Sequence, residues 1–120
     1  MIRELRMLVL VLLLGALPLF GAIKPHGKAS WYGMEGRKTA SGERIHPRGM
    51  TAAHKTLPFG ALVLIQNLRN RRTAVVRIID RGPYVKGRII DVSRTAAKKL
   101  GIIESGIAPV RIWVLSIPKS

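Results

Sequence analysis

Two apolar runs, residues 61–68 and 73–80, flank a polar segment at 69–72, and this pattern constrains the fold most strongly. Both runs are rich in Val, Leu and Ile, which favour strands, so the pattern predicts a β-hairpin. Because alternate strand residues point to opposite faces, Val76 and Ile78 lie on one face of the second strand and Val75 and Ile79 on the other. A strand that is apolar on both faces suits a closed barrel.

Short strands separated by Gly, Pro and Asn are expected throughout residues 27–117, and 120 residues leave room for a single domain. We expect an opening strand at 28–32 and a closing strand at 108–117. One helix is expected at 94–100, with Ser93 as its N-cap and Gly101 after its end. The sequence therefore predicts a mostly β domain with one structural helix.

The first 22 residues resemble a secretory signal peptide. An apolar run at 7–20 follows Arg3 and Arg6. The run is shorter than the roughly 20 apolar residues that span a membrane. We therefore expect export to the periplasm or cell envelope, with residues 23–26 as a linker.

An uncleaved N-terminal anchor is the alternative, and it would be the only contact with a membrane. Pro18 interrupts the apolar run, and Phe20 stands where a small residue usually precedes the cleavage site. The chain contains no Cys, so we expect neither a lipid anchor nor disulfides.

The chain carries a net charge of +15, and +14 remains once residues 1–22 are set aside. Such an excess favours a polyanionic partner, for example nucleic acid, anionic lipid or a cell-wall polymer. Export argues against nucleic acid. A basic surface that serves only solubility is the alternative.

Acidic residues are scarce, numbering six, and two of them stand in turn-like segments. Glu43 ends the segment 39–43, and Asp80 ends an apolar strand just before Gly82. His54 closes the segment 51–54. Each has a structural alternative: Asp80 could accept turn amides or pair with an Arg, Glu43 could pair with Arg44 or Arg37, and His54 could be a satisfied buried residue.

Five segments, 29–33, 39–43, 51–60, 80–84 and 87–93, resemble in order and spacing the rare lipoprotein A family of septal-ring lytic transglycosylases. The resemblance implies a six-stranded double-psi β-barrel with one or two short helices, similar to the barrel of expansins. It also implies endolytic cleavage of peptidoglycan glycan strands between N-acetylmuramic acid and N-acetylglucosamine, which leaves 1,6-anhydro ends. The family's functional positions correspond to Glu43, His54 and Asp80.

Cleavage of a glycosidic bond needs an acid to protonate the departing oxygen and a group that stabilises a positively charged sugar. When the sugar's own 6-hydroxyl attacks, one carboxyl can serve first as acid and then as base. We expect Asp80 to fill this role, with Glu43 and His54 assisting. Arg81 would lower the pKa of Asp80 if it lay close, but strand alternation predicts that Arg81 points away.

Tyr84, Tyr32, Arg81 and Lys55 are the candidate substrate-binding residues. Tyr84 lies beside Gly82, where it could line a cleft, and Tyr32 could stack on a sugar ring, although core packing is commoner for an aromatic in a strand. Asp91 is expected to be structural, either near the helix start or paired with Arg88.

Other chemistries are disfavoured. Ser41 lacks the strand-to-helix turn of a hydrolytic nucleophile, and the spacing of His26, His46 and His54 matches no zinc site. No glycine-rich loop suggests a nucleotide. We therefore expect no cofactor and no metal.

Two functions remain: a lytic transglycosylase, or a non-catalytic, expansin-like module that binds wall glycan without cutting it. Because both would share one barrel, the fold cannot choose between them. A cytoplasmic nucleic-acid binder is a weaker third interpretation that rests on charge alone. No obvious oligomerisation surface is present, so we expect a monomer.

Overall fold

The computed structural model describes residues 23–33 and 35–119, so the expected signal peptide or anchor lies outside the described residues. None of the described helices is long and apolar enough to cross a membrane. The elements follow in the order β1 (His26–Tyr32), β2 (Thr51–Ala53), β3 (Leu62–Asn67), β4 (Thr73–Asp80), β5 (Arg88–Ser93), α2 (Arg94–Leu100) and β6 (Ile107–Ser116).

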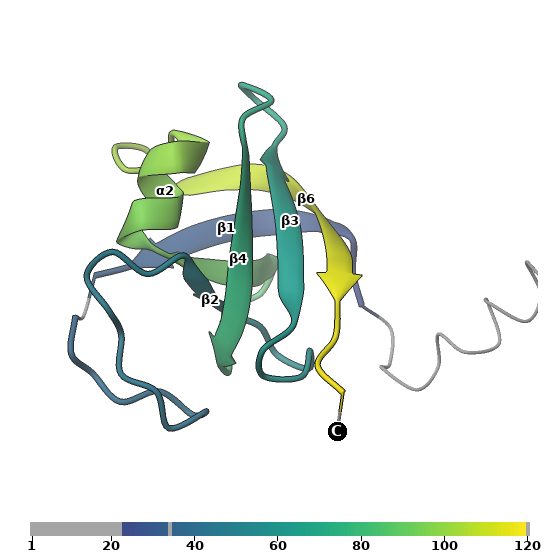
Figure 1. Ribbon diagram of the computed structural model, residues 1–120. Helices are drawn as coiled ribbons and strands as arrows, with labels where there is room; N and C mark the ends of the chain where they lie inside the picture. Colours follow the sequence, from purple (N-terminus) through teal and green to yellow (C-terminus); the bar gives the residue numbers. More distant parts are fainter. Residues whose placement is uncertain (1–22, 34, 120) are drawn as a thin grey trace, which may run out of the picture.

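The six strands close into a barrel in the order β1-β5-β2-β4-β3-β6 (Figure 1). The pairs β1–β5 and β2–β4 are parallel, and the other four are antiparallel. Parallel neighbours need a crossover connection, so strands far apart in sequence become adjacent. This is the six-stranded double-psi β-barrel that the resemblance implied. The predicted hairpin is confirmed as β3 and β4.

The barrel interior holds the hydrophobic core. Ala74, Val76 and Ile78 of β4 are at most 1% exposed and point inward. Burying each large aliphatic side chain of this kind stabilises the fold by roughly 1.5–3 kcal/mol. On the other face Val75 is exposed, whereas Ile79 is buried where the amide of Ser41 donates to its carbonyl at 3.1 Å. The strand is thus apolar on both faces, as expected.

The predicted helix is confirmed at residues 94–100, and both its ends are capped. The Ser93 hydroxyl accepts the amide of Ala96, and Gly101 adopts the left-handed conformation with φ of 74°. The side-chain amides of Asn67 and Asn70 both donate to the carbonyl of Leu100, at 2.9 and 3.0 Å. These contacts fix the end of the helix to the hairpin turn.

A long connection between β1 and β2 folds back beside the ends of β2 and β4, at the lower left of Figure 1. An isolated bridge between Lys38 and Arg44 shapes it into a narrow loop. The amide of Ser41 ties the loop to β4. The loop thereby brings Arg37, Ala40 and Glu43 to the edge of the barrel.

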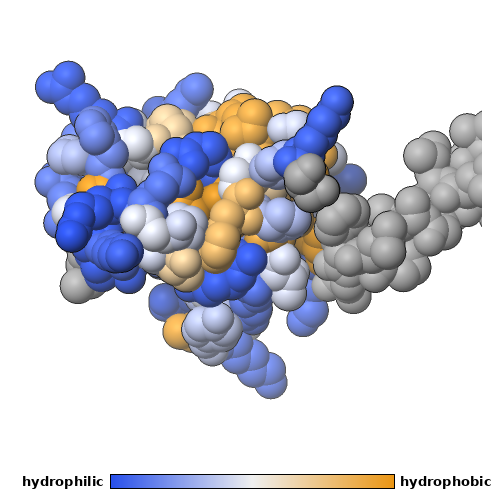
Figure 2. Space-filling view, turned by 60° about the horizontal axis from the view of Figure 1, so that its bottom comes forward, coloured by the Kyte–Doolittle hydropathy of each residue, from blue (hydrophilic) through white to orange (hydrophobic). Residues whose placement is uncertain are grey.

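Hydrophilic side chains dominate the face turned forward in Figure 2, with smaller apolar patches among them. Tyr84 and Val85 are the most exposed apolar residues next to the end of β4, at 76% and 53%. Most of the described Lys and Arg residues are exposed, so the basic excess of the composition lies on the surface.

Candidate active site

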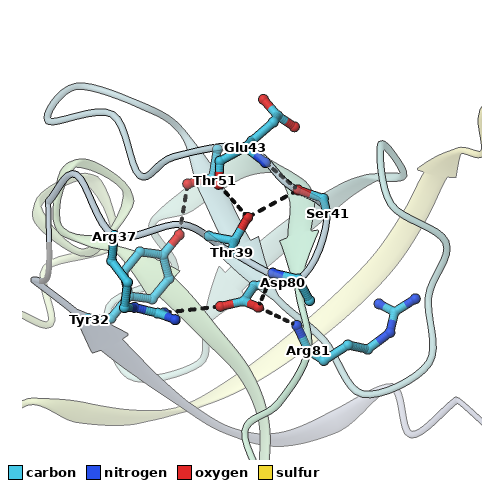
Figure 3. Close-up of polar contacts among 9 residues, drawn as sticks. Tyr32, Arg37, Thr39, Ser41, Glu43, Thr51, Asp80 and Arg81 are labelled. Carbon is cyan, nitrogen blue, oxygen red and sulfur yellow. Dashed lines mark hydrogen bonds and ion pairs between the residues drawn. The ribbon is translucent and has the colours of Figure 1, made fainter.

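Asp80 ends β4 and is held by four polar contacts. Its Oδ1 accepts the amides of Ala40 and Arg81, each at 2.9 Å, and its Oδ2 lies 3.0 Å from Nη2 of Arg37 (Figure 3). Its backbone carbonyl accepts the amide of His54 at 3.1 Å. The side chain is 13% exposed, so the carboxylate can still reach a ligand.

The contacts of Asp80 favour its ionised form. Partial burial acts to raise the pKa of this carboxyl, but the two backbone amides and the Arg37 guanidinium outweigh burial and lower the pKa below its ordinary value. A carboxylate of this kind is better suited to stabilising positive charge than to donating a proton. This environment opposes the acid role that we expected for Asp80.

Arg81 points away from the Asp80 carboxylate, as strand alternation predicted (Figure 3). Its Nη1 donates to the carbonyls of Leu57 and His54, at 2.8 and 3.3 Å, and its guanidinium lies 4.0 Å from the ring centre of Phe59. Arg81 therefore braces the segment after β2. The guanidinium beside Asp80 comes instead from Arg37, which we had considered only as a partner of Glu43.

Glu43 pairs with Arg77 of β4 rather than with Arg44 or Arg37. Two hydrogen bonds join the groups, the one from Nη2 to Oε1 measuring 2.9 Å, and they lower the pKa of Glu43. In Figure 3 the Glu43 carboxylate points away from Asp80. Glu43 and Arg77 both line a hollow of about 480 Å³, which Thr51 also lines.

His54 follows β2 and is 5% exposed. Its Nδ1 accepts the amides of Thr56 and Leu57, each at 3.1 Å, so the ring proton is on Nε2. Burial lowers the pKa of His54 to about 4, and the charges of Arg81 and Lys55 add to the effect. The imidazole is therefore neutral at physiological pH.

His54 and Glu43 line different hollows. His54 lines one of about 300 Å³, where Lys24, Lys55 and Arg88 are also found and none of the described acidic residues lies. Glu43, His54 and Asp80, which we expected to act together, therefore do not converge on one hollow. The Asp80 carbonyl accepts the amide of His54. The Asp80 carboxylate accepts the amide of Ala40, which lies in the loop that carries Glu43.

The other candidate residues have different surroundings. The Tyr32 hydroxyl lies 2.7 Å from Oγ1 of Thr51, and burial raises the pKa of Tyr32 to about 12. Tyr84 is 76% exposed and lines none of the hollows described above. Lys55 is exposed and lines the hollow of His54, which we call the cationic hollow because Lys24, Lys55 and Arg88 line it.

Asp91 was expected near the helix cap or paired with Arg88, but Ser93 is the cap. Its Oδ1 accepts a hydrogen bond of 2.9 Å from Ser30 Oγ. Burial raises the pKa of Asp91, and the nearby negative charge of Asp80 adds to the rise. One sequence signal was available, because an acid flanked by Ile90 and Val92 inside a strand must find a partner.

No cluster of three His, Asp or Glu side chains suited to a metal occurs among the described residues. The groups described above are the two aspartates Asp80 and Asp91, the neutral imidazole of His54, Glu43 in its pair with Arg77, and several lysines and arginines.

Comparison with known proteins agrees with the fold and the motifs. The protein family described as lytic transglycolase matches residues 24–112. The chain is 58% identical over 93 residues to a probable endolytic peptidoglycan transglycosylase RlpA of Nostoc sp., covering 74% of this chain and 25% of that protein. It is 53% identical over 95 residues to the endolytic peptidoglycan transglycosylase RlpA of Pasteurella multocida, covering 78% and 32%.

An expansin of Clavibacter michiganensis has a similar fold, with a TM-score of 0.61 at 21% identity, covering 80% of this chain and 52% of that one. The chain spans about a quarter to a third of the length of the two RlpA proteins. The family match nevertheless covers most of the barrel, so the chain belongs to the double-psi β-barrel family of lytic transglycolases.

Proposed function

We propose that the barrel is a peptidoglycan lytic transglycosylase, which cleaves glycan strands between N-acetylmuramic acid and N-acetylglucosamine and leaves 1,6-anhydro ends. Family membership and the names of the RlpA relatives support this reaction. The single observation that carries the proposal is the rigid placement of the Asp80 carboxylate at the end of a barrel strand, next to Ile79, which lines the hollow of Glu43.

The two hollows suggest the path of the glycan. Thr51 at the start of β2 lines the hollow of Glu43, and His54 and Lys55 just after β2 line the cationic hollow. A linear polymer lying along β2 would therefore pass from one to the other. Lys55 and Arg88 supply positive charge for the carboxylates of the wall polymer.

Asp80 serves in this proposal as a fixed anion next to the reacting sugar. As the glycosidic bond breaks, positive charge develops at the anomeric carbon, and a carboxylate held by Arg37 and two amides needs no rearrangement to stabilise it. The 6-hydroxyl of the same sugar then closes the 1,6-anhydro ring.

A non-catalytic wall-binding module is the alternative. One observation favours it: the carboxylates of Glu43 and Asp80 both pair with arginines, so neither is a ready proton donor. The expansin-like fold is compatible with either function.

Incubation of the purified protein with glycan strands stripped of peptides tests the proposal, with anhydro-muramyl ends detected by mass spectrometry. We expect the wild type to form them and Asp80→Asn to lose activity by about 10²-fold. Glu104→Gln, an exposed acid between α2 and β6, is the matched control and should keep full activity. Tight glycan binding by the wild type without product would favour the binding module.

We also propose that the protein is exported to the periplasm or cell envelope and acts there as a monomer. Residues 1–26 fused to a reporter should direct it out of the cytoplasm. A reporter retained in the cytoplasm would contradict export and revive a nucleic-acid partner. Light scattering of the purified protein tests the monomer.

A further inference from the structure

Asp91 and Asp80 border the same residue from opposite sides. In the β2–β5 pair Asp91 stands opposite Ala53, and in the β2–β4 pair Asp80 stands opposite Ala53. Adjacent strands lie about 4.8 Å apart, so the two aspartate backbones are roughly 10 Å apart. The residue between them, Ala53, has only a methyl side chain.

The alternation of side chains along β5 places Asp91 on the outer face of the barrel. Its neighbours Ile90 and Val92 are fully buried in the core, so Asp91 points the other way. A register shift between Ala52 and Ala53 interrupts the β2–β4 ladder next to Asp80, and irregularities of this kind re-aim side chains at functional sites.

Asp91 also lies between the two hollows. On β5, Ile89 lines the cationic hollow two residues before Asp91. On β2, Thr51 and His54 line the two hollows on either side of Ala53. The middle of a glycan that spans both hollows would therefore lie over Asp91 and Asp80. The bond to be cut would lie there.

One carboxyl oxygen of Asp91 remains available. Ser30 donates to Oδ1, and Oδ2 has no protein partner among the described residues. Because no fully buried side-chain oxygen among the described residues lacks a partner, those residues do not fully enclose Oδ2. A proton on Oδ2 could be passed directly to a ligand.

The charged groups around Asp91 come from four segments. Asp80 faces it from β4, Arg37 from the long loop and Arg88 from its own strand, while Tyr32 of β1 feels the charges of both aspartates. Burial raises the pKa of Asp91, whereas the amides and Arg37 lower that of Asp80. Two neighbouring carboxyls whose pKa values move apart are the usual arrangement of an acid beside a permanent anion.

We propose that Asp91 is the proton donor of the glycosidic cleavage and that Ser30 is the residue that positions it. This inference rests on the proposed transglycosylase function and deepens it, because it assigns the acid that Asp80 is poorly suited to be.

The protons balance with a single carboxyl group. Protonated Asp91 gives its proton to the glycosidic oxygen as the bond from that oxygen to the anomeric carbon breaks, and it becomes a carboxylate. The 6-hydroxyl oxygen then bonds to the anomeric carbon, and its proton returns to Asp91. Asp80 stays ionised throughout and faces the developing positive charge.

The first test compares Asp91→Asn with the wild type on peptide-stripped glycan strands. We expect product formation to fall by about 10²-fold or more while glycan binding stays within about threefold. Thermal melting and co-sedimentation with glycan check the fold and binding. Wild-type turnover in a folded Asp91→Asn protein overturns the inference but leaves the function standing, whereas a wild type without product refutes the function itself.

The second test uses pH and remains decisive even if Asp91→Asn fails to fold. The value of kcat/KM falls as pH rises through the pKa of the proton donor. This decline is the falling limb of the pH profile. Ser30→Ala removes a hydrogen bond that lowers the pKa of Asp91, so the falling limb should move to higher pH. Asp80→Asn removes a negative charge that raises it, so the falling limb of its residual activity should move to lower pH.

Shifts in these opposite directions support Asp91 as the acid. Falling limbs that stay at the wild-type pH in both variants overturn the inference. If Asp91 were only structural, the loss of the Ser30 hydrogen bond would not change the pH dependence of activity. Thr95→Ala is the matched control: this exposed hydroxyl donates only to the carbonyl of Pro47 and should leave the limb in place.

Discussion

Arg37 and Asp80, 43 residues apart in sequence, form an ion pair with 3.0 Å between Nη2 and Oδ2. The pair joins a loop to the end of a barrel strand, and the loop also supplies the Ala40 amide to the same carboxylate. The charge state of the candidate site is therefore set partly by a loop residue.

Replacement of Arg37 should raise the pKa of Asp80. Arg37→Gln removes a positive charge that lowers the pKa of Asp80 and also that of Asp91, so both should rise. Carbon-detected NMR titration of the aspartate carboxyls measures this. Arg44→Gln is the control, since Arg44 donates to the Gly36 carbonyl and should leave both aspartates unchanged. An unchanged Asp80 in Arg37→Gln would contradict the role of the ion pair.

The Glu43–Arg77 pair should contribute little to stability. Its side chains are 47% and 42% exposed, so water screens the interaction. A double-mutant cycle with Glu43→Gln and Arg77→Gln, followed by urea unfolding, should give a coupling free energy below about 1 kcal/mol. A coupling several times larger would mean that the pair is a structural clamp.

Stability should fall as the pH drops from about 6.5 toward 4, because of His54. The pKa of His54 is lowered to about 4 in the fold, so below 6.5 the unfolded chain binds a proton that the folded chain excludes. The free energy of unfolding should decrease over this window by up to roughly 3 kcal/mol, and nothing should be lost above it.

Urea unfolding at several pH values measures the effect. His54→Asn keeps an acceptor for the Thr56 and Leu57 amides but cannot titrate, so its loss of stability in this window should be smaller. His46→Asn, an exposed matched change that also keeps an acceptor for an amide, should follow the wild type. Identical curves for the wild type and His54→Asn would rule out His54 as the cause.

The end of α2 should depend more on Asn67 than on Asn70, although both donate to the Leu100 carbonyl. Asn67 is 2% exposed and also accepts the amide of Arg69. Asn67→Ala leaves buried polar groups without partners and should destabilise the protein by about 1–3 kcal/mol. Asn70→Ala, at an exposed position, should cost less than about 1 kcal/mol. Equal losses in thermal melting would contradict this ranking.

Local patterns allowed the sequence to predict the β3–β4 hairpin and α2. The hairpin depends on two apolar runs and the turn between them, and Ser93 and Gly101 mark the helix ends. The closing strand was placed within one residue at each end, at 107–116 instead of 108–117. The apolar pattern did not identify β2, because its three residues gain their identity from parallel pairing with a distant strand.

The candidate site was harder to predict because its geometry depends on long-range contacts. Asp80 was found from its position at a strand end, but its partner Arg37 could not be chosen among 21 Lys and Arg residues without the loop conformation. Asp91 was taken as structural because only the barrel register brings it opposite Ala53, beside Asp80. Residue types could therefore be predicted, while their pairing could not.

The parallel pairing of β1 with β5 has a consequence for how the proposed site is assembled. Ser30 and Asp91 meet across 61 residues, and Ala53 links Asp91 to Asp80 only when β2 lies between β5 and β4. No hairpin or other early fragment contains the complete set. Pairing between such distant segments is intrinsically slow. An unfinished chain thus lacks the proposed site, which is complete only once β2 has paired with both β4 and β5.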